Sequence, residues 1–434
     1  MIAPRAVFSA RRLGRSRFAR TAFASLALGD YVAQGDFSAQ AVGTASDLYG
    51  WTFSRASGAS TYSTLAGTVV LGIAVDAGRI AAQSAGLAGL LIEPSRTNYV
   101  LKASDLTGSG WTAGTAATET ANATTAPDGT VTAHRSAGAS GTFGKYWSKA
   151  VASAVNSRWV SSLWIKDNGG GRPSLVSAIF AQTATIYPAP VASWKRHTHR
   201  SAANDSGIAG SNYIFCDGRN CLGIGGGAAA AFDVYRWGHQ AEIGPYATSL
   251  IATTGASATR AADRLSRSTT SALTAGRKLR IYSRFTALAA ETDYSEPGAT
   301  AERFLVQDTT GFYKIWAESG KIYAQAYADD VSTFASVYTT SGSLSWAAGD
   351  LVELWVSMGG GVSPVIEWRI NGGAIVTPTL SHPARHLRIQ ASGPFVIGAT
   401  LHALTGNAGA KGLPGIHHEL SLFKDGKAPA GFTP

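Results

Sequence analysis

Residues 352–358 read Val-Glu-Leu-Trp-Val-Ser-Met, and residues 366–372 read Ile-Glu-Trp-Arg-Ile-Asn-Gly. In both stretches an apolar side chain stands at every second position, which is the period of a β-strand with one buried face. The Asn-Gly pair that ends the second stretch is a strong two-residue signal for a β-hairpin turn. Residues 279–285 and 416–422 alternate in the same way. Together these strands predict an antiparallel β-sandwich over residues 276–434.

The rest of the chain has the composition of a second β-domain. The 434 residues are too many for one hydrophobic core, and 50 glycines with only 15% charged residues favour short strands joined by turns. Residues 158–166 and 232–237 have strand-like patterns. We expect a first sandwich with its entry strands over 46–265, then a weakly apolar linker over 266–275. The predicted fold is all-β, with two antiparallel β-sandwiches after an N-terminal arm over residues 1–45.

The predicted arm is basic. Six of the first twenty residues are arginine and none is acidic, while the whole chain has a net charge of +10. The remainder is thus close to neutral and lacks the basic, aromatic-rich face of a nucleic-acid-binding domain. An arm of this composition cannot fold alone, so we expect it to anchor the protein on a partner surface, with a disordered tail or a weak targeting peptide as alternatives. No apolar run has transmembrane length. The arginines are Arg5, Arg11, Arg12, Arg15, Arg17 and Arg20.

Two segments bracket the predicted first sandwich. They are Gly89-Leu-Leu-Ile-Glu-Pro-Ser-Arg-Thr-Asn98 and Trp237-Gly-His-Gln-Ala-Glu-Ile-Gly-Pro-Tyr-Ala-Thr-Ser249. They resemble segments of virion-surface proteins of tailed bacteriophages and gene transfer agents. Trp194 is similar to a tryptophan that starts a strand midway through such modules. In layout the resemblance extends roughly from residue 50 to residue 430, and its motifs are structural ones that tolerate many ligands.

The resemblance implies a jelly-roll module followed by a concanavalin-like (laminin-G-like) sandwich. It implies a head spike or tail fibre that attaches the particle to host cell-surface polysaccharide, with the arm bound to other virion proteins at a capsid vertex or tail. It further implies a homo-oligomer, a trimer or a pentamer, that is assembled in the bacterial cytoplasm and displayed on the particle. We expect no enzymatic activity, no nucleic acid and no membrane insertion. A structural adaptor without a ligand and a secreted bacterial lectin are alternatives.

A predicted hairpin is the candidate carbohydrate site. With a turn at Ser319-Gly320, one face of the hairpin carries aromatic, amide and amine side chains, and the other carries small apolar ones. Aromatic faces stack on sugar rings while polar groups recognise hydroxyls. The alternative is that this aromatic face packs against a partner subunit or a neighbouring sheet. The predicted pairs are Trp316 with Tyr323, Lys314 with Gln325 and Phe312 with Tyr327.

One acidic segment bears on the question of catalysis. Glu291, Asp293 and Glu296 have a spacing that resembles the catalytic strand of retaining glucanases on the concanavalin-like sandwich, where two carboxylates flank the glycosidic bond. The segment lacks branched apolar residues and is followed by Pro-Gly, so we expect a solvated loop. A polysaccharide depolymerase is the enzymatic alternative.

The remaining candidates imply no metal and no cofactor. Cys216 and Cys221 flank an Asp-Gly turn and are expected to be a reduced or optional hairpin pair, since two cysteines lack the ligand count for zinc. His197 and His199 share one face of a predicted strand, but no third ligand follows at a useful spacing.

Overall fold

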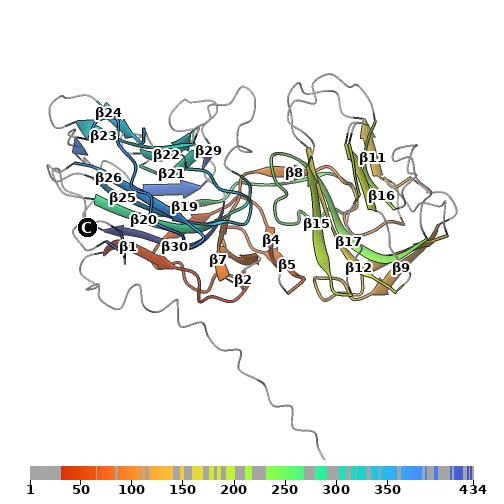
Figure 1. The fold of residues 1–434 in the computed structure, drawn as a ribbon. Coiled ribbons are helices and arrows are strands. Elements are labelled where there is room, and N and C mark those ends of the chain that lie inside the picture. Colours follow the sequence, from red (N-terminus) through yellow and green to blue (C-terminus); the bar gives the residue numbers. More distant parts are fainter. Residues whose placement is uncertain are drawn as a thin grey trace, which may run out of the picture.

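The structure is a computed structural model, and every element that it describes is a β-strand. The prediction of an all-β protein is therefore confirmed. The strands form two sandwiches that lie side by side (Figure 1). The described residues are 31–64, 66–83, 87–107, 110–112, 117–139, 147–150, 159–169, 175–179, 183–186, 192–200, 211–217, 231–267, 279–290, 303–308, 314–318, 320–328, 334–340, 342, 344–358, 363–383, 387–388, 395–398, 411–412, 415–423, 428–429 and 431–432.

The larger sandwich, which we call the terminal sandwich, combines strands from both ends of the chain. Within the described ranges its two sheets have ten and nine strands. The first sheet has the order β26 (Val365–Ile370), β25 (Leu351–Met358), β20 (Leu279–Ala287), β30 (Gly415–Phe423), β7 (Leu87–Ile92), β6 (Arg79–Gln83), β4 (Ala59–Ser63), β5 (Thr68–Ile73), with β1 (Tyr31–Asp36) beside β30 and β2 (Gly43–Thr44) beside β6. The second has the order β24 (Phe334–Tyr338), β23 (Lys321–Ala328), β22 (Lys314–Glu318), β21 (Arg303–Asp308), β28 (Phe395–Gly398), β19 (Arg264–Arg267), β3 (Thr52–Ser54), with β27 (Leu387–Arg388) beside β23 and β29 (Lys411–Gly412) beside β21.

The core of the terminal sandwich lies between these sheets. Ile281 and Phe285 of β20 and Leu354 of β25 face Ile315 of β22 and Ala324 of β23, and each is at most 2% exposed. The alternation predicted for residues 279–285 and 352–358 therefore separates the face in this core from the opposite face, which is buried as well, since Tyr282 and Trp355 pack with Phe432 there. Burial of a large apolar side chain of this kind contributes about 1.5–3 kcal/mol. This burial holds the two sheets together.

The turn after β26 has the predicted geometry. Asn371 and Gly372 have φ angles of 53° and 70°, and positive φ at both central positions is what a type I′ turn requires. Beyond the turn, Val376 returns to an antiparallel bridge with Trp368.

The smaller sandwich, which we call the inserted sandwich, has a five-stranded and a four-stranded sheet in the described part of the chain. The first has the order β15 (Lys195–Arg200), β12 (Trp159–Asp167), β17 (Phe232–Ile243), β10 (Ala133–Gly138), β9 (Thr118–Thr124). The second has the order β11 (Trp147–Ala150), β16 (Ser211–Asp217), β13 (Leu175–Ile179), β14 (Thr183–Ile186).

The five-stranded sheet is buried on both faces. Leu163 of β12 and Val234 of β17 pack into the core of the inserted sandwich. On the opposite face, Trp164 and Trp237 belong to the same apolar cluster as the core of the terminal sandwich. The two sandwiches are therefore joined by continuous apolar packing.

Strand pairing changes the predicted domain boundaries. β7 pairs with β30 and β3 pairs with β19, so residues 46–92 belong to the terminal sandwich and not to the first sandwich of the sequence. The region predicted to be a jelly roll is an insertion between β7 and β19, rather than a domain that precedes the other one. A period of two shows which residues form strands. It does not show which distant strand completes the sheet. Strands that are neighbours in sequence pair most often, but here strands far apart in sequence pair instead.

The predicted arm and linker lie only partly within the described residues. From Tyr31 onward the arm range is folded, because β1 pairs with β30 from Tyr31 opposite Phe423 to Asp36 opposite Glu419. The six arginines of the arm lie outside the described residues. The first two residues of the predicted linker over 266–275 belong to β19. Its other residues lie outside the described ones.

Charged side chains are buried at the neck where the inserted sandwich joins the terminal one. Five of them, each at most 2% exposed, form what we call the neck cluster: Arg55, Arg79, Glu93, Arg260 and Asp263. Arg79 and Arg260 donate to Glu93 Oε2 at 2.9 and 2.8 Å. Arg79 also donates to Asp263, and Arg55 donates to Asp263 Oδ1 at 3.3 Å. Buried charges are tolerated when they are paired and hydrogen-bonded, as these are.

The two segments of the resemblance meet at this neck. The Ser249 backbone N–H and hydroxyl both donate to the carboxylate of Glu93 at 2.7 Å. Asn98 Nδ2 donates to the carbonyl oxygens of His239 and Ile251 at 3.2 and 2.9 Å. β8 (Arg96–Asn98) also pairs with β18 (Ala258–Arg260), so the chain enters and leaves the inserted sandwich on adjacent strands. The polar residues of both segments thus have structural roles.

We expect Glu93→Gln to lower the free energy of unfolding by about 3–5 kcal/mol at neutral pH. The reason is that removing one partner leaves Arg79 and Arg260 buried beside an uncharged amide. Urea unfolding followed by tryptophan fluorescence measures the change. Asp47→Asn is the matched control, because Asp47 is exposed and an amide oxygen can still accept from the Tyr49 N–H. A loss below about 1 kcal/mol for Glu93→Gln would contradict this role of the neck cluster.

The stability of the protein is expected to fall with acid in a defined window. Burial alone raises the pKa of Glu93, but Arg260, Arg79 and Ser249 outweigh it and lower the pKa from 4.5 to about 2. A carboxyl with a depressed pKa stabilises the fold fully above pH 4.5, and this contribution is lost as the pH falls towards 2. Unfolding measured across this window should show a smaller pH dependence in Glu93→Gln than in the wild type. An equal change of unfolding free energy with pH in the two proteins would contradict this contribution of Glu93.

Candidate functional site

The predicted hairpin has the register expected from the sequence. Trp316 lies opposite Tyr323, and Lys314 lies opposite Gln325, on strands β22 and β23. The small apolar side chains of the other face are buried in the core. Tyr327 pairs through its backbone with Phe334, and its side chain lies outside the described ones, as does the whole of Phe312.

The aromatic side chains of this hairpin pack on one another. Trp316 is only 5% exposed, and its ring stacks on Tyr323 with centroids 4.8 Å apart and an interplanar angle of 9°. The rings of Tyr323 and Tyr338, which is in β24, have centroids 5.1 Å apart, and Lys314 Nζ lies 5.1 Å from the centroid of the Trp316 ring. Tyr323, Tyr338 and Gln325 are half-buried. Trp316, one of the aromatic residues predicted to stack on sugar, is thus covered, and the partly exposed side chains of this face are those of Lys314, Tyr323, Gln325 and Tyr338.

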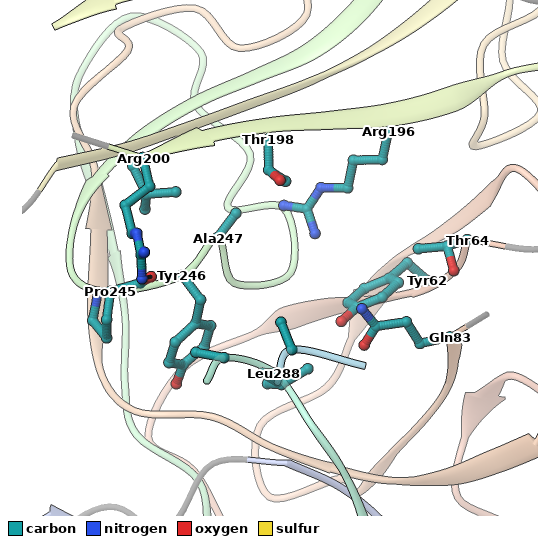
Figure 2. A pocket seen from close by; sticks show the side chains of 13 residues that line it. Tyr62, Thr64, Gln83, Arg196, Thr198, Arg200, Pro245, Tyr246, Ala247 and Leu288 are labelled. Atoms are coloured by element: carbon teal, nitrogen blue, oxygen red, sulfur yellow. Dashed lines mark hydrogen bonds between the residues drawn. The ribbon is translucent and has the colours of Figure 1, made fainter. Parts of the chain in front are cut away.

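A cleft lies between the two sandwiches, with a volume of about 380 Å³ (Figure 2). Volumes of this size are typical of small-molecule sites. The terminal sandwich contributes a polar group of residues at the ends of β4 and β6: Tyr62, Thr64 and Gln83. It also contributes small apolar contacts next to β20 and β25: Leu288, Ala289 and Ala348.

The inserted sandwich supplies the charged wall of the cleft. Arg196, Thr198 and Arg200 occupy alternate positions of β15, so the pleat directs all three to one face. Figure 2 shows these side chains pointing into the cleft above Tyr62 and Tyr246. Val160 of β12 and residues 245–247, which follow β17, complete this wall. Among the described residues that line the cleft, none is acidic.

Arg196 is held in place by uncharged partners. Its Nη2 donates to Ser162 Oγ at 2.9 Å and to the carbonyl oxygen of Thr248, and its guanidinium lies 5.3 Å from the centroid of the Tyr62 ring. In the described part of the chain no carboxylate lies within 4.0 Å of this guanidinium. Arg200 Nη1 donates to the Pro245 carbonyl oxygen at 3.5 Å. Two guanidinium groups, with no acid among the described lining residues, favour a positive electrostatic potential in the cleft.

Direct contacts between the two sandwiches fix the walls of the cleft relative to each other. The Val69 N–H of β5 donates to the Pro127 carbonyl oxygen at 2.9 Å, and Ser60 Oγ donates to the Leu250 carbonyl oxygen at 2.6 Å. Gly67, with a φ of 64°, lies so close to Trp194 that a Cβ there would approach its carbonyl oxygen to 2.6 Å. A cleft between walls fixed in this way is preorganised for a ligand.

The sequence did not identify this cleft, although one signal was present. Arg196 and Arg200 flank Thr198 in an alternating pattern, which places two cations on one strand face. The same strand carries the predicted histidine pair on its other face. There, His197 is 6% exposed, and burial, followed by the charge of Lys195, lowers its pKa to about 4. His197 is therefore an uncharged, buried side chain, and the side chain of His199 is not described.

Several predicted residues fall outside the described ones. Glu291, Asp293, Glu296 and Cys221 are among them. Cys216 lies in β16, where only its backbone is described. Across the described ranges, no group of three or more His, Cys, Asp or Glu side chains is arranged to hold a metal ion. The same ranges contain no helix of the length and apolar character that a membrane span needs.

We expect Trp316→Ala to lower the free energy of unfolding by about 3–5 kcal/mol, as loss of a buried tryptophan side chain does. Lys321→Ala in the same hairpin is the control. Its side chain is exposed, and its contact with the Tyr338 ring at 5.2 Å is worth at most about 1 kcal/mol. Thermal unfolding of both variants tests this. Similar small losses in the two variants would mean that Trp316 is a surface residue.

Comparisons with known proteins give little support for any function. No protein-family model matches the chain, and no curated protein matches it. Among solved structures, it is similar to the N-terminal CBM22-1–CBM22-2 tandem domain of Xyn10C from Paenibacillus barcinonensis, with a TM-score of 0.23 and 10% sequence identity. That match covers 78% of this chain and 98% of the other. A similarity this weak carries no argument about what this protein binds.

Proposed function

We propose that this chain is a surface subunit of a phage or gene-transfer-agent particle, a head spike or tail fibre, and that it binds host cell-surface polysaccharide without cleaving it. Its proposed binding site is the cleft between the two sandwiches. The proposal includes a homo-oligomer held on the particle by the basic arm through other virion proteins. The particle, the oligomer and the arm rest on the resemblance of residues 89–98 and 237–249 to virion-surface proteins.

The lining of the cleft is the observation that carries the binding function. Sugar hydroxyls are recognised by side chains that both donate and accept hydrogen bonds, and Thr64, Gln83 and Thr198 supply hydroxyl and amide groups. Tyr62 and Tyr246 add aromatic surface next to them. These groups come from both sandwiches, so a ligand in the cleft would contact both.

The chemistry of the cleft favours binding over hydrolysis. Glycoside hydrolases of the usual kind place two carboxyl groups on either side of the scissile bond. The described lining residues include no such pair. The depolymerase alternative would therefore need acids from outside the described lining residues, such as Glu291, Asp293 and Glu296.

Filling the cleft should remove the proposed function. Ala247→Trp places a large side chain in the cleft without changing its charge, and we expect at least about tenfold weaker binding to the bacterial capsular polysaccharide that the wild type binds best in a purified panel. Val75→Trp is the control, because Val75 is 53% exposed and does not line the cleft. Glycan-array binding of the full chain measures the effect.

Three outcomes would contradict the proposal. Unchanged binding by Ala247→Trp would show that the polysaccharide binds outside the cleft, and the β22–β23 hairpin would be the next candidate site. New reducing ends in the polysaccharide would indicate a depolymerase. No binding to any member of the panel would favour a structural adaptor.

A further inference from the structure

We infer that the cleft recognises an acidic saccharide, a sugar unit with a carboxylate, through Arg196 and Arg200. This inference rests on the proposed function, because it names the ligand class of the same site. It starts from the difference between Arg196 and other arginines of the protein. Arg79, Arg236 and Arg369 each donate to a carboxylate of the protein, at 2.9, 2.9 and 2.6 Å.

Arg196 has no carboxylate partner among the described residues. It is half-buried, so its guanidinium is partly removed from water while its protein partners are a hydroxyl, a carbonyl oxygen and an aromatic ring. A partly desolvated cation gains more from an added anion than one in bulk water does. The described lining of the cleft offers no such anion, and therefore a ligand is the natural source of one.

The donors of Arg196 also suit a carboxylate in shape. Nη2 holds the side chain against the inserted sandwich, while within the described contacts Nε and Nη1 donate to no protein atom. A guanidinium group presents its N–H groups in a planar fork that matches the two oxygens of a carboxylate. Arg200 lies four residues further along β15, on the same strand face, and its side chain is exposed. It adds a second positive charge at the cleft.

The neighbours of the arginines suit the rest of a sugar unit. Thr198 lies between the two arginines on β15, and Gln83 faces them from the terminal sandwich (Figure 2). Both can pair with hydroxyl groups. A small inorganic anion would leave these groups and most of a 380 Å³ cleft unused, whereas a carboxylated sugar would engage the charged and the neutral groups together.

The inference is tested with matched ligands. The full chain is titrated with polygalacturonate, alginate and hyaluronan, and with each of these after chemical reduction of its carboxyl groups. Dextran and dextran sulfate are the neutral and the sulfated comparison. We expect at least one carboxylated polymer to bind at least about tenfold more tightly than its reduced form, because hydrogen bonds to charged groups are stronger than those between neutral groups.

Matched variants locate the effect. Arg200→Gln and Arg196→Lys should each weaken binding of the carboxylated polymer severalfold, and Arg196→Lys keeps the charge while it removes the fork. Lys195→Gln is the control, because it removes one exposed positive charge from the neighbouring position of β15, which the pleat directs to the opposite face. Circular dichroism and the melting temperature show that each variant is folded.

The outcomes separate this inference from the proposed function. Equal binding of native and reduced polymers, or equal losses in Lys195→Gln and Arg200→Gln, would overturn the inference and leave polysaccharide binding intact. Binding to dextran sulfate alone would overturn it in favour of non-specific charge attraction. If no carboxylated polymer binds although the capsular panel yields a ligand, the inference is overturned and the proposed function stands. If the panel is negative as well, the proposed function fails and the inference fails with it.

Discussion

The fold depends on two carboxylates buried where the inserted sandwich meets the terminal one. Glu93 and Asp263 precede and follow the insertion in the chain, and three arginines hold them together out of contact with water. A buried ion pair is a weak source of net stability, but it permits little freedom of geometry, because any misplacement leaves a charge unpaired. The neck cluster therefore sets how the two sandwiches face each other, and with that the width of the cleft between them.

Local strand structure was predictable because it depends on a period of two. The strands around residues 279–285, 352–358 and 366–370 and the register of the Trp316–Tyr323 hairpin follow from side chains that alternate between a core and an outer face. The placement of the domains was not predictable in the same way. Pairing of β7 with β30 joins residues more than 300 positions apart, and no pattern within either strand names the other.

The candidate site was missed for the same reason. Its residues come from β4, β6, β15 and the segment after β17, and only their assembly makes a cleft. Arginines at alternate positions of β15 were visible in the sequence, but alternating cations are also common on exposed strands. At Trp316 the sequence left two interpretations open, a sugar-stacking platform and a packed aromatic face. Stacking on Tyr323 and contact with Lys314, both within the same hairpin, accompany a Trp316 ring that is only 5% exposed.

The insertion topology has a consequence for how such a protein diversifies. Because the chain passes into and out of the inserted module on two adjacent antiparallel strands, recombination at that crossing would exchange the whole module and leave both sheets of its host intact. Each exchange would rebuild one wall of the cleft, including its arginines, while Tyr62 and Gln83 stayed unchanged. The ligand preference of the cleft could thus change in a single genetic event, instead of by gradual substitution.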